Sequence, residues 1–269
     1  MGKRLAALWA ERKVCWILVK RDLRVRYARS FLGYVWSIVE PLANALVYFL
    51  IFGVVFQLSD AGHKPYFLFL LIGLLPWQWF NTAVTDAPRA LLQEAKLVKS
   101  TNLPREIWVV RMILAKGIEF VLSLPVLLLF FVIYAVRGEA HVNGMLWLFP
   151  VAMVVQFLLQ VGIGLILAPL TVLVNDVQPL IRIFLRVFFY LCPVIFQLKQ
   201  LENPKVPQIV RDIYVYNPFT GILEMYRAGF FDNPLTVAPI VSAFVGTAVI
   251  LLIGGLVFTR LEKPVLKEI

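Results

Sequence analysis

The chain is poor in the residue types on which most soluble enzymes depend. Only 16% of its 269 residues are charged, and it contains two histidines and two cysteines. Soluble domains carry about 25% charged residues, so this chain has too little polar surface to cover one. Cys15 and Cys192 lie far apart in the sequence, and His63 and His141 form no metal-ligand set. We therefore expect neither a disulfide nor a metal site.

Nucleotide-binding motifs are absent as well. No GxxxxGK[ST] phosphate loop occurs, and the only Gly-Lys pair is Gly2-Lys3. No stretch outside the apolar segments is long enough for an ATPase domain. We therefore expect no catalytic residue and no cofactor in this chain, so any ATP and Mg²⁺ that drive it would bind to a partner. The N-terminus does not resemble a secretory signal, because no short apolar core precedes residue 30.

What the chain does contain is apolar sequence, with 61% hydrophobic residues and a mean hydropathy of +0.82. That excess must face lipid, so the composition predicts an all-α integral membrane protein. A helix needs about 20 residues to cross the hydrocarbon core. Six segments fit: 34–57, 65–84, 107–136, 145–174, 177–197 and 235–259.

The basic residues give these six spans an orientation. The net charge is +10, and nine of the 26 Lys and Arg residues lie in the first 29 positions. The predicted inner segments 1–33, 85–106 and 260–269 together carry 16, whereas the outer loops 58–64, 137–144 and 198–234 carry 6. The positive-inside rule therefore predicts a multi-pass inner-membrane protein with both termini in the cytoplasm. The positive charge is explained by the membrane surface, and no nucleic-acid partner is expected.

Residues 3–29 are predicted to form an amphipathic helix at the membrane interface. Apolar residues recur at helical spacing, namely Leu5, Trp9, Trp16, Val19, Leu23 and Tyr27. A basic helix with a tryptophan-bearing apolar face is typical of helices that lie in the interface plane. The alternative is that the apolar stripe packs against the rest of the protein.

Two loops have a pattern of their own. The inner loop 85–106 is polar and helical in pattern. The outer segment 198–234 holds four prolines around two apolar stretches, 209–215 and 219–231, each too short to span. Such stretches beside a membrane predict two short re-entrant or interfacial helices between spans five and six.

Charged residues inside the predicted spans are candidates for function. Lys116 and Glu119 are three residues apart and can pair on one helix face. Arg111 and Lys116 lie near the inner interface, where long side chains can extend to water. Arg182 and Arg186 share one face of span five, where guanidinium groups could bind a lipid pyrophosphate. An ordinary positive-inside anchor is the alternative for that pair.

Aromatic residues, 14% of the chain, gather near the predicted span ends. Most such residues form interface belts. Some could instead line a channel and stack on sugar rings. The candidates for a substrate channel are Tyr34, Trp36, Trp77, Phe80, Phe188 and Tyr190.

Five sequence strings, in order, resemble the membrane subunits of type 2 ABC transporters, and the branch that exports polysaccharides most of all. They are Arg21-Asp22-Leu23-Arg24-Val25-Arg26-Tyr27 with Leu32-Gly33-Tyr34-Val35-Trp36 and Pro41-Leu42; Gly73-Leu74-Leu75-Pro76-Trp77 with Phe80-Asn81; Leu103-Pro104-Arg105-Glu106; Cys192-Pro193-Val194-Ile195; and Tyr216-Asn217-Pro218-Phe219 with Glu224 and Tyr226-Arg227. The resemblance covers nearly the whole chain.

The resemblance implies a single transmembrane domain over residues 1–269, with an N-terminal interface helix, six spans and a coupling helix in the loop 85–106. It also implies pairing with a second copy and with two ATP-binding cassette subunits, and a polymer on undecaprenyl diphosphate as substrate, such as an O antigen, teichoic acid or capsule. By this analogy the ATPase contact involves Gln93, Glu94, Lys96, Lys99 and Arg105. Which polymer is moved, and in what kind of bacterium, is left open.

Three other readings remain at this stage. A type 2 ABC permease for a small lipid or drug would share the fold and the partner. A membrane-embedded glycosyl- or acyltransferase would need acids and histidines that converge on one side of the membrane. His63 and His141 with Asp60 and Glu139 are the only set of that kind, and all four lie in short outer loops. A purely structural membrane scaffold would leave the polar inner loop without a role.

Overall fold

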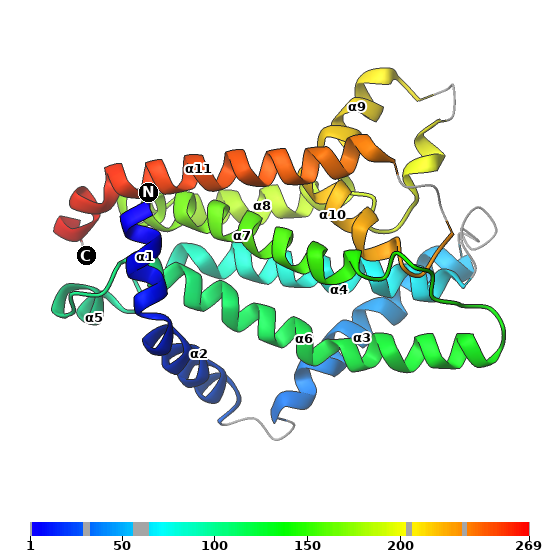
Figure 1. The fold of residues 1–269 in the computed structure, drawn as a ribbon, viewed down its shortest axis with the longest axis horizontal. Helices are drawn as coiled ribbons and strands as arrows, with labels where there is room; N and C mark the ends of the chain where they lie inside the picture. Colours follow the sequence, from blue (N-terminus) through cyan, green and yellow to red (C-terminus); the bar gives the residue numbers. More distant parts are fainter. Residues whose placement is uncertain (1, 29–32, 56–64, 203–205, 233–235, 269) are drawn as a thin grey trace.

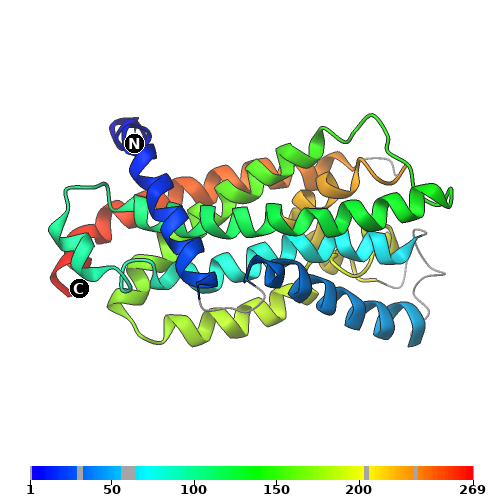
Figure 2. The same ribbon diagram turned by 90° about the horizontal axis from the view of Figure 1, so that it is seen from below.

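The computed structural model describes residues 2–28, 33–55, 65–202, 206–232 and 236–268, and every regular element in these ranges is helical. The long helices lie side by side in one elongated bundle (Figure 1). The two ends of the chain both lie at the same end of this bundle, which we call the termini end (Figures 1 and 2). This is the arrangement expected of an even number of crossings.

Helix α4 (Tyr66–Asp86) is the centre of the bundle. Sixteen of its residues are buried, on all sides of the helix. A helix that is hydrophobic all round is stable only when other helices surround it. It packs against α3, α6, α7, α8 and α10, and the pictures show it enclosed by them.

Four helices in the described ranges are long and apolar enough to cross a membrane. They are α4 with the short turn η4 (Ala87–Arg89), α6 (Glu106–Val136), α7 (Leu148–Leu173) and α11 (Val237–Glu268). They match the predicted spans 65–84, 107–136, 145–174 and 235–259. Helix α11 continues nine residues past its predicted end, because the charged stretch after position 259 keeps helical geometry at the termini end.

The other two predicted spans do not form single long α-helices. The segment 34–57 becomes a 3₁₀ turn η1 (Gly33–Val35), helix α3 (Trp36–Tyr48) and a π-helical stretch η2 (Phe49–Val55). The segment 177–197 becomes α8 (Val177–Tyr190), which has only 14 residues. At about 1.5 Å per residue, 14 residues do not cross a hydrocarbon core of about 30 Å. The end of the predicted span forms a non-helical turn instead, at residues 191–196.

The N-terminal segment is two helices rather than one. Helix α1 (Gly2–Ala10) and helix α2 (Arg12–Tyr27) are separated at Glu11. The predicted apolar stripe also divides. Val19 and Leu23 are buried against the protein, whereas Trp9 and Trp16 are 71% and 46% exposed. Packing against the protein therefore accounts for Val19 and Leu23, and Trp9 and Trp16 are left exposed.

Two close helix contacts depend on glycine. Helices α7 and α11 meet where a Cβ at Gly254 would lie 2.3 Å from the carbonyl oxygen of Gly162. Small residues of this kind let the backbones of membrane helices approach closely. A Cβ at Gly221, on α10 (Pro218–Arg227), would lie 1.9 Å from the carbonyl oxygen of Pro239 on α11.

The predicted loops 85–106 and 198–234 both contain short helices. The first holds α5 (Ala95–Ser100) beside the termini end (Figure 1). The second holds the 3₁₀ turn η5 (Leu198–Glu202), α9 (Gln208–Tyr216) and α10. Helix α10 is largely buried, whereas α9 has no buried residue.

Candidate functional site

Helix α5 and its flanks leave an exposed surface at the termini end. Leu92 and Leu97 are 41% and 36% exposed, and Gln93, Lys96 and Lys99 are exposed as well. Val98 alone of helix α5 is buried and holds it to the bundle. Exposed apolar side chains surrounded by lysines are typical of a docking surface, and here they lie on a short helix that projects from the bundle.

Glu94, in contrast, turns into the protein. Its carboxylate binds Arg21 of α2 and lies 3.3 Å from Nη2 of Arg111 on α6. Arg111 also binds Asp22 of α2. We call Arg21, Asp22, Glu94 and Arg111 the ion-pair network. It joins α2, the α5 loop and the long helix α6 through one buried guanidinium, that of Arg111.

A second group of charges connects the two ends of the chain. Arg4 of α1 lies 2.6 Å from Glu106 at the start of α6 and 2.8 Å from Glu262 on α11. Arg105 lies 3.2 Å from the same Glu262. Arg105 is therefore half-buried and tied to α11, unlike the exposed lysines of α5.

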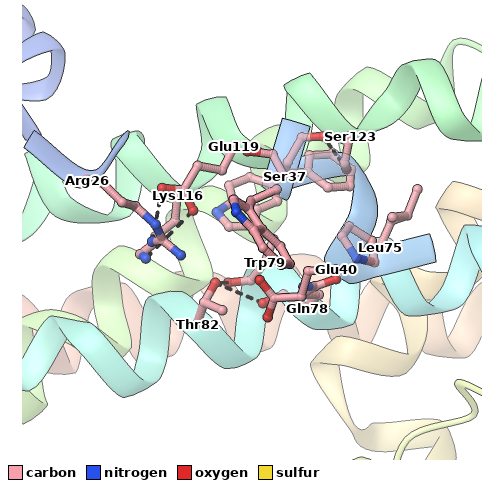
Figure 3. A pocket seen from close by; sticks show the side chains of 13 residues that line it. Arg26, Ser37, Glu40, Leu75, Gln78, Trp79, Thr82, Lys116, Glu119 and Ser123 are labelled. Atoms are coloured by element: carbon pink, nitrogen blue, oxygen red, sulfur yellow. Dashed lines mark hydrogen bonds and ion pairs between the residues drawn. The ribbon is translucent and has the colours of Figure 1, made fainter. Parts of the chain in front are cut away.

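Lys116 and Glu119 pair on α6 at 3.7 Å, as their spacing predicts. Each also has a partner on another element. Asp86 lies 2.8 Å from Lys116, and Arg26 lies 3.0 Å from Glu119 (Figure 3). The prediction that Arg111 and Lys116 extend to bulk water is therefore wrong. Both are buried, because acidic groups from α2, the α5 loop and α4 compensate their charge.

Arg182 and Arg186 lie on one exposed face of α8. Neither makes a hydrogen bond or ion pair within the part of the chain that the structure describes. The same helix exposes apolar side chains, including Ile183 at 59% and Val187 at 55%. Helix α8 thus combines two unpaired guanidinium groups with an apolar surface.

The aromatic candidates divide by burial. Trp77 and Phe80 are buried in a cluster with Phe188, which is half-buried, and with Phe219 of α10. In this single chain their rings pack against one another. Trp36 and Tyr190 are 47% and 62% exposed and can line one. The side chain of Tyr34 lies outside what the structure describes.

Toward the other end of the bundle, sequence reasoning missed a buried arginine. Arg227 of α10 donates to the carbonyl oxygens of Pro193 and Val194 at 2.6 and 2.7 Å, and its guanidinium lies 3.8 Å from the ring centre of Phe69. We call this the arginine anchor. Gly73 fits beside it, since a Cβ there would lie 2.6 Å from Nη2 of Arg227.

Further contacts hold the same turn. Asn217 donates to the carbonyl oxygen of Leu191, and the hydroxyl of Tyr66 donates to that of Ile195. The strings that contain Gly73, Cys192 and Asn217 therefore meet in space. Their order in the sequence was the only signal that could have linked them.

The described part of the outer loops contains His141 and Glu139 of the set considered for an enzyme. Within the described ranges no group of three or more His, Cys, Asp and Glu residues could hold a metal ion. His141 lies 2.5 Å from Asp232 and 91 residues from it in sequence, and both are exposed. His63 and Asp60 lie outside the described residues. Cys15 and Cys192 are free and buried.

Comparisons with known proteins agree with this architecture. Residues 13–231 match the family described as ABC-2 type transporter. The O-antigen export system permease protein RfbA of Myxococcus xanthus is 30% identical over 235 residues, which cover 87% of this chain and 86% of that protein. RfbA of Klebsiella pneumoniae is 27% identical over 246 residues, 91% of each chain. The polysialic acid transport protein KpsM of Escherichia coli is 25% identical over 244 residues, which cover 86% of this chain and 90% of that protein.

The family match extends from helix α2 to the end of the α10 region, so it includes the ion-pair network, helix α5 and the arginine anchor. Together with four helices long enough to cross a membrane, it shows that the chain belongs to the ABC-2 type transporter family and is a multi-pass inner-membrane transport subunit.

Proposed function

We propose that this protein is the permease of an ATP-driven exporter that moves a polysaccharide linked to undecaprenyl diphosphate from the cytoplasm to the outer face of the inner membrane. The observation that carries the proposal is that proteins similar over almost the whole chain are permeases of O-antigen export and a transport protein for polysialic acid.

The assembly that we propose contains two copies of this chain and two ATP-binding cassette subunits. ATP and Mg²⁺ bind to the latter. Both termini and α5 face the cytoplasm, in keeping with the charge distribution along the sequence and with the position of both termini at one end (Figure 1). Helix α8 is too short to cross alone, so we propose that α8 and the turn at residues 191–196 together make the fifth crossing. The α3–η2 segment makes the first of the six crossings, and α9 and α10 form the outer re-entrant pair.

Coupling to ATP hydrolysis is proposed to use the candidate residues in two ways. Gln93, Lys96 and Lys99 are exposed and form the contact with the ATPase. Glu94 and Arg105 point inward and pass a movement of α5 to α2, α6 and α11 through their ion pairs. A change at one site shifts another only through an element with two arrangements. Ion pairs shared among several segments can provide such an element.

The transport path is proposed to run along the exposed faces of α3 and α8. Trp36 and Tyr190 offer rings on which sugars can stack. Arg182 and Arg186 offer guanidinium groups without protein partners, which suit the diphosphate of the lipid carrier.

The test is a pull-down of the tagged permease with its ATPase, followed by an assay of ATP hydrolysis in nanodiscs. The double variant Lys96→Glu/Lys99→Glu should lose about tenfold or more of the ATPase recovered, because both exposed lysines reverse their charge. The matched control Lys263→Glu/Lys267→Glu alters two exposed lysines at the same end of the bundle and should retain the partner.

The variant Arg111→Gln distinguishes binding of the ATPase from coupling of ATP hydrolysis to transport. It leaves the exposed surface of α5 intact, so the ATPase should still bind, while transport per ATP hydrolysed should fall. Recovery of the permease without any ATPase, under several detergents, would contradict the transporter proposal. Equal loss of partner in both lysine double variants would contradict the assignment of α5 as the docking element.

A further inference from the structure

A small polar cavity, to which no role has been assigned, lies between the end of α2, the start of α3, the second half of α4 and the middle of α6. Its volume is about 70 Å³. The charged side chains that line it are Arg26, Glu40, Lys116 and Glu119, and the lining also holds Ser37, Gln78, Thr82, Ser123 and the rings of Trp36, Trp79 and Phe120 (Figure 3). Such a polar lining between apolar helices indicates a ligand or ordered water.

The charges in this cavity balance, two basic against two acidic groups. Arg26 and Lys116 are paired with Glu119. Glu40 is different, because it has no hydrogen bond or ion pair with any residue that the structure describes. Its side chain is exposed at the edge of the cavity, within the first predicted span, where an ionised carboxylate without a partner is costly. The cavity therefore offers a carboxylate to a cationic group.

A second, neutral group points to the same cavity. The indole Nε1 of Trp79 is buried, and no acceptor lies within hydrogen-bond distance in the described part of the chain. The ring is stacked on Phe120 with centroids 5.0 Å apart, so it cannot turn toward water without losing this contact. A buried donor is normally satisfied by a ligand or a water molecule.

A larger hollow of about 580 Å³ adjoins the small cavity and shares Arg26, Lys116 and Glu119 with it. This hollow lies under α2, the helix whose basic and tryptophan-bearing sequence places it at the level of the lipid head groups. The small cavity could thus hold one end of a head group while the hollow holds the rest. Trp36, half-exposed at the rim, is of the type that lies at this level.

We propose that the cavity binds the head group of a zwitterionic phospholipid with a primary ammonium, of the phosphatidylethanolamine class. The ammonium pairs with Glu40 at the edge of the cavity, and the phosphate accepts from Arg26 at the boundary with the hollow. A primary ammonium has three donors and a small volume, whereas a trimethylammonium has none and is larger. The balanced charge of the lining suits a zwitterion better than a diphosphate, and the site is separate from the arginine face of α8.

The proposal is tested by native mass spectrometry of the delipidated permease–ATPase complex, without substrate, titrated with lipids of identical acyl chains. Phosphatidylethanolamine should be retained about tenfold more strongly than phosphatidylcholine or phosphatidylglycerol, a difference that the method resolves. In Glu40→Gln the preference should disappear. Glu139→Gln, which alters an exposed acid in an outer loop, should keep it.

Two further variants protect the test against misfolding. Glu40→Asp retains the charge and should keep part of the preference, and Arg26→Gln should weaken both zwitterionic lipids alike. Equal retention of all three lipids by the unaltered complex would overturn the proposal, and so would stronger binding of phosphatidylglycerol. Because no substrate is present, these results do not depend on whether the chain exports a polysaccharide.

Discussion

The ion-pair network and the arginine anchor both depend on a buried arginine, but they use it differently. Arg111 binds carboxylates on two other segments, and these carboxylates keep 19–25% of their side-chain surface exposed. Arg227 donates to two backbone carbonyls and lies over an aromatic ring. These partners have fixed positions inside the protein. Carboxylates at the edge of water can exchange partners at little cost, whereas buried carbonyls cannot. We therefore expect movement at the termini end and rigidity around the turn 191–196.

Removal of the anchor should have the largest effect. In Arg227→Met the carbonyls of Pro193 and Val194 lose their donors inside the protein, so the free energy of unfolding should fall by about 2–5 kcal/mol. Chemical unfolding in mixed micelles measures it. Arg137→Ala, at an exposed arginine that ends α6, is the control and should change stability by less than about 0.5 kcal/mol. Equal effects in the two variants would remove the contrast between the regions.

A smaller change tests how tightly the anchor is packed. In Gly73→Ala the added Cβ would lie 2.7 Å from the carbonyl oxygen of Val194 and 2.6 Å from Nη2 of Arg227. Because the backbone oxygen of Val194 cannot move freely, the free energy of unfolding should fall by about 1–3 kcal/mol relative to the unaltered protein. At Gly144 no atom lies within 4 Å of an added Cβ. A matching loss of stability in Gly144→Ala would show that the crowding at Gly73 is not the cause.

The ion-pair network should respond to salt, and the anchor should not. A double-mutant cycle over Arg21→Gln and Glu94→Gln should give a coupling free energy of about 0.2–1 kcal/mol, since 38% of the Arg21 side chain is exposed. That coupling should shrink at about 1 M salt, where the screening length is about 3 Å. The effect of Arg227→Met, measured in the same buffers, should stay constant. A coupling free energy that does not change with salt would show that the ion-pair network is as well shielded from solvent as the arginine anchor.

The smallest effect is expected at the exposed pair of Asp232 and His141. Hydrogen bonds from Asn143 and then from His141 lower the pKa of the Asp232 carboxyl below its ordinary value. A lowered pKa adds stability at pH values above the ordinary carboxyl pKa, and this is lost as the pH falls through the lowered value. The melting temperature of Asp232→Asn should therefore lie slightly below that of the unaltered protein above about pH 4 and match it at lower pH. A difference in melting temperature that grows as the pH falls would contradict the lowered pKa of Asp232.

The sequence by itself determined the properties that depend on composition and local period. Its apolar excess set the helical membrane class, and four of the six predicted spans appear as long helices. The polar pattern of 85–106 and the prolines of 198–234 correctly marked two loops with short helices. The spacing of Lys116 and Glu119 was enough to predict their contact. These features need only neighbours in the sequence, so the sequence contains them.

Only the tertiary structure decided which charges meet and which aromatic rings are buried. Asp22 and Arg111 are 89 positions apart, and Arg227 is 33 positions from Val194, so neither spacing predicts a contact. Phe80 and Trp36 look alike as residues near span ends, yet one is 2% exposed and the other 47%. Burial follows from which helix packs on which face, and the length of α8 follows from a turn held by Arg227. Helical period fixes the direction of a side chain around its own helix, but the neighbour in that direction is chosen by the packing of the whole chain.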